Sequence, residues 1–222
     1  MKYDVLLCLS GGKDSCSLAC KLKEKGLSIL AFTNDVGFMS PVALENIRKL
    51  VDVLEIDHLM FRPKPSVHKK IIDEYFSDSR QSLEDVCGRC ASLMAQAAAF
   101  FARAHGINTI VSGFTKYHAQ ALQADRGMQI LPKMDMGGIT ALNPYCKFYN
   151  LKKIEQMLKK FDIVTDPTQT NCKFLPKIIA TDIKRFGKCS MEDEFNLLLQ
   201  DKQITQEEYT YYRKWVTKEF KL

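Results

Sequence analysis

The sequence predicts an α/β fold, in which a parallel sheet of about five strands carries helices on both faces and a helical extension follows. Two observations predict this fold class. Short apolar runs alternate with stretches of helical periodicity, and the connections between them contain glycine, proline, asparagine and aspartate. Such alternation at short spacing is typical of strand–helix–strand units, whose ligands bind at the carboxyl ends of the strands.

The first elements follow one another closely. Residues 3–9 form an apolar run that predicts a buried strand. Residues 13–25 predict a helix that ends at Gly26, because glycine readily adopts the left-handed conformation of a helix C-terminus. A second strand is expected at 27–33.

The middle of the chain continues the alternation. Ser40 is placed to cap a helix over 41–54, whose first residue is a proline. A third strand at 57–61 precedes a helix at 67–76, and the stretch 90–105, with seven alanines, predicts another helix. The remaining expected elements are strands at 107–112 and 139–142, and helices at 151–160, 177–186, 191–200 and 205–218.

Length and composition set the domain organisation. The 222 residues are 46% hydrophobic and 26% charged, as in an ordinary globular protein, and they fit one domain with an appendage. We expect a main domain over residues 1–172 and a C-terminal helical extension over 173–222. Tyr209 and Tyr212 share one face of the last helix, which predicts a packed hairpin that is also a candidate surface for a homodimer.

Charge and cysteine content indicate the compartment and the class of partner. No apolar run approaches the roughly 18 residues of a membrane helix, and the N-terminal run ends in a glycine loop rather than a cleavage site. Eight cysteines without an export signal favour a reducing compartment, so we expect a cytoplasmic protein with no membrane partner. The net charge of +6, a mild excess of 32 basic over 26 acidic residues, favours nucleotides or RNA as partners.

The segment between the first strand and the first helix reads Ser10-Gly11-Gly12-Lys13-Asp14-Ser15. In this position the unpaired N–H groups and the positive end of the helix face one point, which makes an anion site. The glycine spacing matches neither the Walker pattern nor the dinucleotide pattern. The sequence therefore predicts a phosphate-binding loop of a different class.

This loop reproduces the SGG-x-DS signature of the PP-loop, or N-type, ATP pyrophosphatases, and it resembles that family in its place near the N-terminus. The resemblance implies a Rossmann-like fold of the adenine nucleotide alpha hydrolase type. It also implies cleavage of ATP between its α and β phosphates, adenylylation of an acceptor oxygen and release of pyrophosphate.

The same resemblance implies roles for individual residues. Lys13 and Asp14 are the catalytic candidates, with Lys13 neutralising developing charge and Asp14 helping to hold Mg²⁺. The stretch from Phe32 to Asp35 would meet the adenine and ribose. The candidate nucleotide-binding residues are Ser10, Gly11, Gly12, Lys13, Asp14, Ser15, Phe32, Thr33, Asp35, Ser112 and Gly113.

Three cysteines have a spacing that suits metal or redox chemistry. Cys87 and Cys90 form a C-x-x-C at the expected start of a helix, and Cys172 lies far downstream. Spacing alone does not choose between zinc, iron–sulfur and redox uses. The order of loop, C-x-x-C and distant cysteine resembles the iron–sulfur-dependent tRNA thiolation enzymes, notably the 2-thiocytidine synthetase group. That resemblance implies that the three thiols bind a 4Fe-4S cluster, with zinc or no metal as alternatives.

The reaction after adenylylation has two candidate nucleophiles. The thiolation resemblance implies sulfur from a sulfide or persulfide donor, delivered to a tRNA base or a small-molecule acceptor. However, those relatives carry an acidic pair after the fourth strand, where this chain has the segment 112–118 without one. The stretch from Asn34 to Pro63 resembles instead the PP-loop N-acetyl sugar amidotransferases, which use ammonia. A nucleotide-binding regulator that keeps the loop is the non-enzymatic interpretation.

Overall fold

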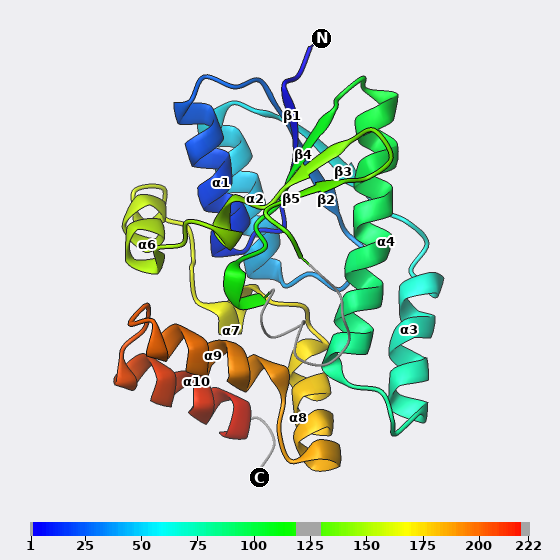
Figure 1. The fold of residues 1–222 in the computed structure, drawn as a ribbon, viewed down its shortest axis with the longest axis vertical. Helices are drawn as coiled ribbons and strands as arrows, with labels where there is room; N and C mark the ends of the chain where they lie inside the picture. The colour runs from blue at the N-terminus through cyan, green and yellow to red at the C-terminus, as the bar shows by residue number, and fades with distance from the viewer. Residues whose placement is uncertain (1, 119–129, 219–222) are drawn as a thin grey trace.

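The computed structural model describes residues 2–118 and 130–218. Within these ranges one sheet of six strands has the order β3-β2-β1-β4-β6-β5 (Figure 1). All neighbouring pairs are parallel except β5–β6, which is antiparallel. The strands are β1 (Val5–Cys8), β2 (Ile29–Asn34), β3 (Asp57–Phe61), β4 (Thr109–Val111), β5 (Lys133–Asp135) and β6 (Thr140–Leu142).

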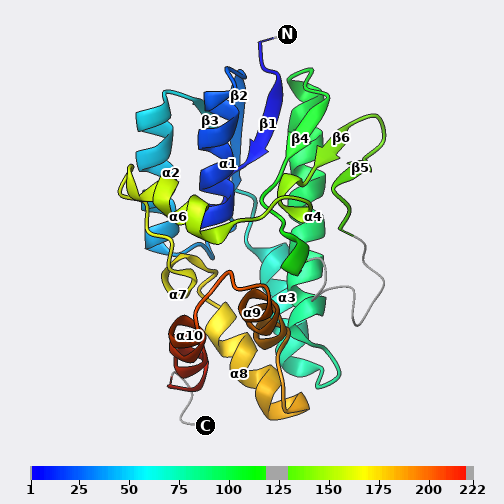
Figure 2. The same cartoon turned by 60° about the vertical axis from the view of Figure 1, so that its left-hand side comes forward.

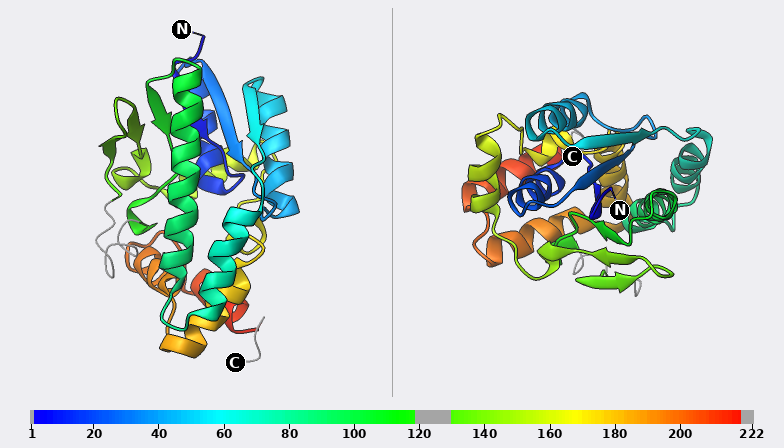
Figure 3. Two further views of the ribbon diagram at one scale, coloured as in Figure 1. Left: turned by 90° about the vertical axis from the view of Figure 1, so that its right-hand side faces the viewer. Right: turned by 90° about the horizontal axis from the view of Figure 1, so that it is seen from above.

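Helices cover both faces of the sheet, because successive strand residues point to opposite sides. On one face, Leu7 packs in a core with α1 (Lys13–Glu24), α2 (Pro41–Leu54) and α6 (Leu151–Lys159). On the other face, Leu6 packs against alanines of α4 (Leu83–Ala104), the long helix of Figures 1 and 3. The predicted α/β class with helices on both faces is confirmed.

Four further helices lie beyond the carboxyl ends of the parallel strands (Figures 1 and 2). They are α7 (Pro167–Thr170), α8 (Leu175–Phe186), α9 (Ser190–Gln200) and α10 (Gln206–Lys218). A cluster formed by α9, α10, Tyr117 and Leu151 joins this helical part to the sheet domain. The boundary at residue 173 stays a prediction.

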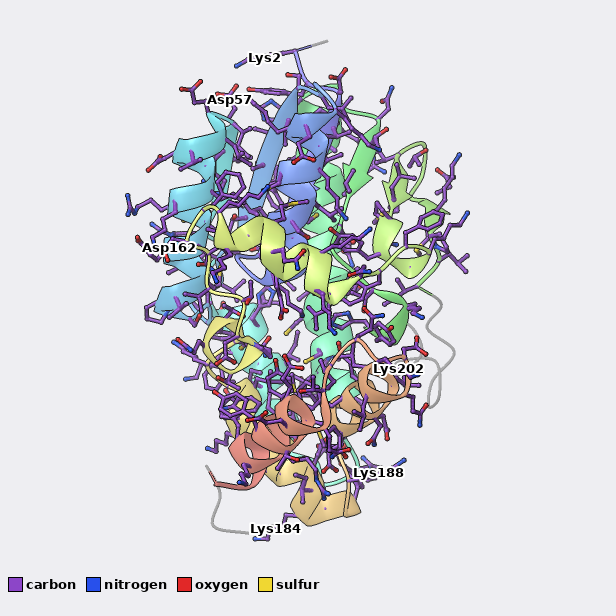
Figure 4. All side chains as sticks on the ribbon, turned by 90° about the vertical axis from the view of Figure 1, so that its left-hand side faces the viewer. Lys2, Asp57, Asp162, Lys184, Lys188 and Lys202 are labelled. Atoms are coloured by element: carbon purple, nitrogen blue, oxygen red, sulfur yellow. The ribbon has the colours of Figure 1, made fainter. Side chains whose placement is uncertain are left out.

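Charged side chains cover the outside of the molecule (Figure 4). Lys2 and Asp57 form an exposed ion pair of 3.0 Å at the end where the first strand begins. Lys184 and Lys188 lie at the opposite end, on and after α8. Within the described residues no helix has the length and apolar character needed to cross a membrane.

Two details of the elements differ from the prediction. The sheet has a sixth strand, β5, which pairs antiparallel with β6 and was not predicted because three residues are too few to show a periodic pattern. Helix α4 begins at Leu83 rather than at residue 90. Its start is fixed by a capping box, in which the Ser82 N–H donates to the Asp85 Oδ2 atom at 2.8 Å.

Helix α3 (Ser66–Ser77) packs with α4 and α8 around two buried polar groups. The Asp182 carboxylate accepts hydrogen bonds from the Tyr75 hydroxyl and the Leu83 N–H, both at 2.7 Å, so one buried side chain joins three helices. His68 is different. It is only 4% exposed, and neither of its ring nitrogens has a hydrogen-bond partner.

We predict that His68→Leu keeps or raises stability, by up to about 2 kcal/mol, because a buried imidazole without partners is replaced by an apolar side chain. Burial lowers the pKa of His68. Below about pH 6.5, His68 binds a proton in the unfolded chain but stays neutral in the folded protein. The free energy of unfolding therefore falls as the pH falls. In urea unfolding, the free energy of unfolding should fall less between pH 7.5 and pH 5.5 in the variant than in the wild-type protein. Equal decreases in the two proteins would contradict the role of His68 in this pH dependence.

Candidate functional site

The loop after β1 is built around Gly11, which has a φ of +77°. A Cβ atom at this position would lie 2.1 Å from the carbonyl oxygen of Ala43 in α2, so the two backbones touch and only glycine fits. The Asn46 amide donates to the Gly11 carbonyl oxygen at 2.9 Å and fixes the contact. Helix α2 therefore sets the path of the predicted phosphate loop.

The two serines of the loop close a ring of hydrogen bonds. The Ser15 hydroxyl accepts from the Ser10 N–H and donates to the Gly12 carbonyl oxygen, both at 3.1 Å. Gly12 is the N-cap of α1, with φ −79°. The ring holds the first turn of α1 at the carboxyl end of β1, where the first N–H groups of the helix have no intrahelical partner. This arrangement is suited to an anion.

The end of β4 reaches the same helix turn from the other side. A Cβ atom on Gly113 would lie 2.9 Å from the Ser15 nitrogen, so the backbone after β4 passes directly over the start of α1. The neighbouring Ser112 hydroxyl donates to the Asn143 Oδ1 atom at 2.5 Å. The structure thus brings Ser112 and Gly113 to the glycine loop, although about 100 residues separate them in sequence.

Lys13 and Asp14 form a half-buried ion pair at the start of α1, with 3.2 Å between Nζ and Oδ2. Burial alone would lower the pKa of Lys13, but the charges of Asp14 and Glu194 outweigh it and the pKa is raised. Lys13 therefore keeps its positive charge next to the loop. The other carboxylate oxygen of Asp14 accepts a hydrogen bond from the Tyr149 hydroxyl at 3.0 Å, a contact that sequence analysis did not find.

The end of β2 lies beside the loop, but two of its candidate side chains have other contacts. Phe32 packs against Phe101, with 5.2 Å between ring centroids, and the Thr33 hydroxyl donates to the Leu9 carbonyl oxygen at 2.7 Å. Only backbone atoms of these two residues would therefore face a nucleotide. Asp35 accepts from the Gly37 N–H at 2.9 Å and lies at the carboxyl edge of the sheet.

Helix α9 approaches the loop from the C-terminal part of the chain. Glu194 is mostly buried, and its carboxylate lies 3.6 Å from His118 Nε2, in the segment after β4. Its charge also acts on Lys13. In the same segment, Lys116 forms an ion pair with Asp201, the C-cap of α9. The helical extension is thus attached next to the predicted phosphate site, which local sequence patterns did not indicate.

The cysteines converge only in part. Cys87 and Cys90 lie inside α4 rather than at its start, because the helix begins at Leu83. Burial, with a smaller effect of the nearby Cys172 thiol, raises the pKa of Cys90 to about 11. Burial also raises the pKa of Cys172. Across residues 2–118 and 130–218, no three His, Cys, Asp or Glu side chains are arranged to hold a metal ion. Within the described residues the three thiols are therefore not arranged as a closed set of metal ligands.

The fold places this molecule among the α/β proteins with a glycine loop after the first strand, and solved structures share that fold. NMN synthetase from Francisella tularensis aligns with a TM-score of 0.55 and 14% identity, over 98% of this chain and 85% of that chain. The U34-tRNA thiolase NcsA from Methanococcus maripaludis, solved with its 4Fe-4S cluster, aligns with a TM-score of 0.57 and 13% identity, over 97% of this chain and 70% of that chain. NH3-dependent NAD synthetase from Campylobacter jejuni aligns with a TM-score of 0.50 and 14% identity, over 99% of this chain and 86% of that chain.

These structural likenesses show a shared fold. The predicted resemblance to the PP-loop ATP pyrophosphatases is therefore confirmed at the level of the Rossmann-like fold. In sequence, the tRNA-specific 2-thiouridylase MnmA from Caldicellulosiruptor saccharolyticus is 34% identical over an alignment of 91 residues, which covers 35% of this chain. The match spans only 25% of that protein's length. No protein-family model matches the chain.

We predict that Gly11→Ala lowers the free energy of unfolding by at least about 3 kcal/mol, because it adds left-handed strain to a backbone overlap. Gly12→Ala is the matched control. Its φ is negative, and the nearest atom to its Cβ is the Ser10 hydroxyl oxygen at 3.7 Å, so stability should change by less than about 1 kcal/mol. Urea unfolding of both variants measures the difference. Equal stabilities would show that α2 does not constrain the loop.

Proposed function

We propose that this protein is a PP-loop ATP pyrophosphatase that adenylylates an acceptor oxygen. The observation that carries the proposal is the tight turn at Gly11, which holds the first turn of α1 at the carboxyl end of β1. The triphosphate of ATP would lie against the first N–H groups of α1, with the positive charge of Lys13 beside it. The match of this loop to the SGG-x-DS signature supports ATP over other anions.

Asp14 is the residue that suits Mg²⁺. Carboxylate oxygens are preferred ligands of Mg²⁺, which is commonly held by one or two carboxylates and by substrate phosphates. The Asp14 carboxylate lies at the first turn of α1, where the phosphates would bind. When bound, the ion would neutralise charge on the phosphates. Lys13 would add a fixed positive charge on the same side.

The proposed reaction has two displacement steps. The acceptor oxygen attacks the α-phosphorus of ATP, the bond from that phosphorus to the bridging oxygen breaks, and pyrophosphate leaves. A sulfur or nitrogen nucleophile then attacks the carbon that bears the adenylate, and AMP leaves with the former acceptor oxygen. The loop residues act in the first step by fixing the phosphates and stabilising the negative charge that develops on pyrophosphate.

Sulfur is the nucleophile that we favour. The support is the identity with the thiouridylase, the fold shared with the tRNA thiolase, and the proximity of Cys90 to Cys172. A tRNA base or a small molecule would accept the sulfur, and a sulfide or persulfide would donate it. We place the protein in the cytoplasm on the ground of its eight cysteines, since thiols are typical of a reducing compartment.

A second function, amide formation with ammonia, has two observations in its favour. The described residues contain no closed group of three metal ligands, and amide formation from an adenylate needs none. The NH3-dependent NAD synthetase shares the fold over 99% of this chain. Self-association through α9 and α10 remains a prediction for either function.

Replacing Asp14 by Asn should weaken the binding of Mg²⁺-ATP by about 10- to 100-fold, because the change removes the carboxylate charge at nearly constant volume. Calorimetry with Mg²⁺ and a non-hydrolysable ATP analogue measures the binding, and pyrophosphate release is measured with bulk tRNA as acceptor. Asp162→Asn is the control, since Asp162 is an exposed partner of Lys49. Unchanged affinity in Asp14→Asn would remove this residue from the site.

Anaerobic purification followed by iron, sulfide and zinc analysis separates the sulfur and ammonia alternatives. If the thiols hold a cluster, the protein should be brown, and Cys172→Ala should lose most of the absorbance near 400 nm. Cys146→Ala is the control, because the Cys146 thiol donates to the Phe114 carbonyl oxygen and lies outside the C-x-x-C region. Colourless protein without iron or acid-labile sulfide would contradict the cluster and favour ammonia.

A further inference from the structure

We propose that Tyr149 is a positioning residue for the Asp14 carboxylate, a role that rests on the proposed function of Asp14. Tyr149 lies in the segment that follows β6 and precedes α6, 135 positions from Asp14 in the chain. Its hydroxyl donates to Asp14 Oδ1 at 3.0 Å. A carboxylate only accepts hydrogen bonds, so the direction of this bond is fixed.

The two oxygens of Asp14 have different partners. Lys13 Nζ lies 3.2 Å from Oδ2, and the Tyr149 hydroxyl donates to Oδ1. Lys13 is on the same helix turn and has a long flexible side chain, so it follows Asp14 rather than orienting it. Tyr149 comes from another part of the fold and is held by a rigid ring. It is therefore the contact that fixes the rotation of the carboxylate.

The ring of Tyr149 is itself fixed from two sides. It packs edge to face with Tyr117, at 5.5 Å between ring centroids, and with Tyr145, at 5.6 Å. Tyr117 belongs to the segment after β4, which also carries Gly113 across the start of α1. Tyr149 thus joins Asp14, through its hydroxyl and its ring, to the two segments that follow β4 and β6.

Tyr145 provides a built-in comparison. It is buried, whereas Tyr149 is partly buried, and its hydroxyl is hydrogen-bonded to Ser17 at 2.6 Å, one turn further along α1. Both tyrosines therefore connect the same segment to the same helix through a hydroxyl. Only Tyr149 bonds the residue that would hold Mg²⁺, so loss of the Tyr145 hydroxyl tests packing and loss of the Tyr149 hydroxyl tests positioning.

The expected effect follows from the geometry of metal-ligating carboxylates. Hydrogen bonds from a neighbouring group orient such ligands, and their removal commonly costs 10- to 100-fold in metal affinity or activity. Without the Tyr149 hydroxyl, Asp14 is free to rotate toward Lys13 and share both oxygens with it. The Mg²⁺ concentration needed for half-maximal binding of an ATP analogue should then rise by about 10-fold or more.

The experiment compares Tyr149→Phe and Tyr145→Phe in the full chain. Calorimetric titration with a non-hydrolysable ATP analogue, at a series of Mg²⁺ concentrations and without Mg²⁺, gives the metal dependence of binding for each protein. Thermal unfolding without nucleotide shows whether both variants keep the fold. Support requires a shifted Mg²⁺ dependence in Tyr149→Phe, unchanged metal-free binding, and a dependence within about twofold of wild type in Tyr145→Phe.

Three outcomes would overturn the proposal. Equal shifts in both variants would show that the tyrosines act through packing. Wild-type Mg²⁺ dependence in Tyr149→Phe would show that its hydroxyl does not orient Asp14, while the proposed function would stand. If the wild-type protein binds no ATP analogue at any Mg²⁺ concentration, the proposed function fails, and the role of Tyr149 fails with it.

Discussion

The arrangement of the candidate site depends on a contact between two backbones, at Gly11 and Ala43. Because the Ala43 carbonyl oxygen occupies the space of a Cβ atom at position 11, the loop has one path from β1 into α1. Asn46 reinforces that path, since its amide bonds both the Gly11 and the Val164 carbonyl oxygens. On the other side, a Cβ atom on Gly113 would lie 2.9 Å from the Ser15 nitrogen, a looser contact than the 2.1 Å at Gly11. The first turn of α1 is thus clamped between segments that tolerate no side chain.

This constraint explains which parts of the site were predictable. The order of glycines and serines in residues 10–15 is a local pattern, and its place between strand and helix follows from periodicity. The place of Gly113 in the candidate site could be predicted because ligands bind at the carboxyl ends of parallel strands. Tyr149 lies 135 positions beyond Asp14 and Glu194 lies 181 positions beyond Lys13, and no local spacing marks either contact. Their contacts depend on how the later segments fold back over the sheet.

The helical extension adds charged and aromatic side chains to the candidate site that the sheet domain does not supply. Phe195 and Tyr212 stack with 4.8 Å between ring centroids and join the cluster around Tyr117 and Leu151. This packing brings Glu194 close enough for its charge to act on Lys13, and it surrounds the start of α1 with protein. Charges interact more strongly away from bulk water. Under the proposed function, this packing would strengthen the interaction of Lys13 with bound phosphates.

The short antiparallel strand β5 has a consequence for solubility. A parallel sheet that ended at β6 would expose a row of backbone donors and acceptors on which another chain could assemble. β5 covers that edge with only three residues, and two of them, Lys133 and Asp135, are exposed and charged. A short charged border of this kind is a poor template for intermolecular β-pairing. The strand that sequence periodicity missed is thus the one that protects the protein against aggregation along this border.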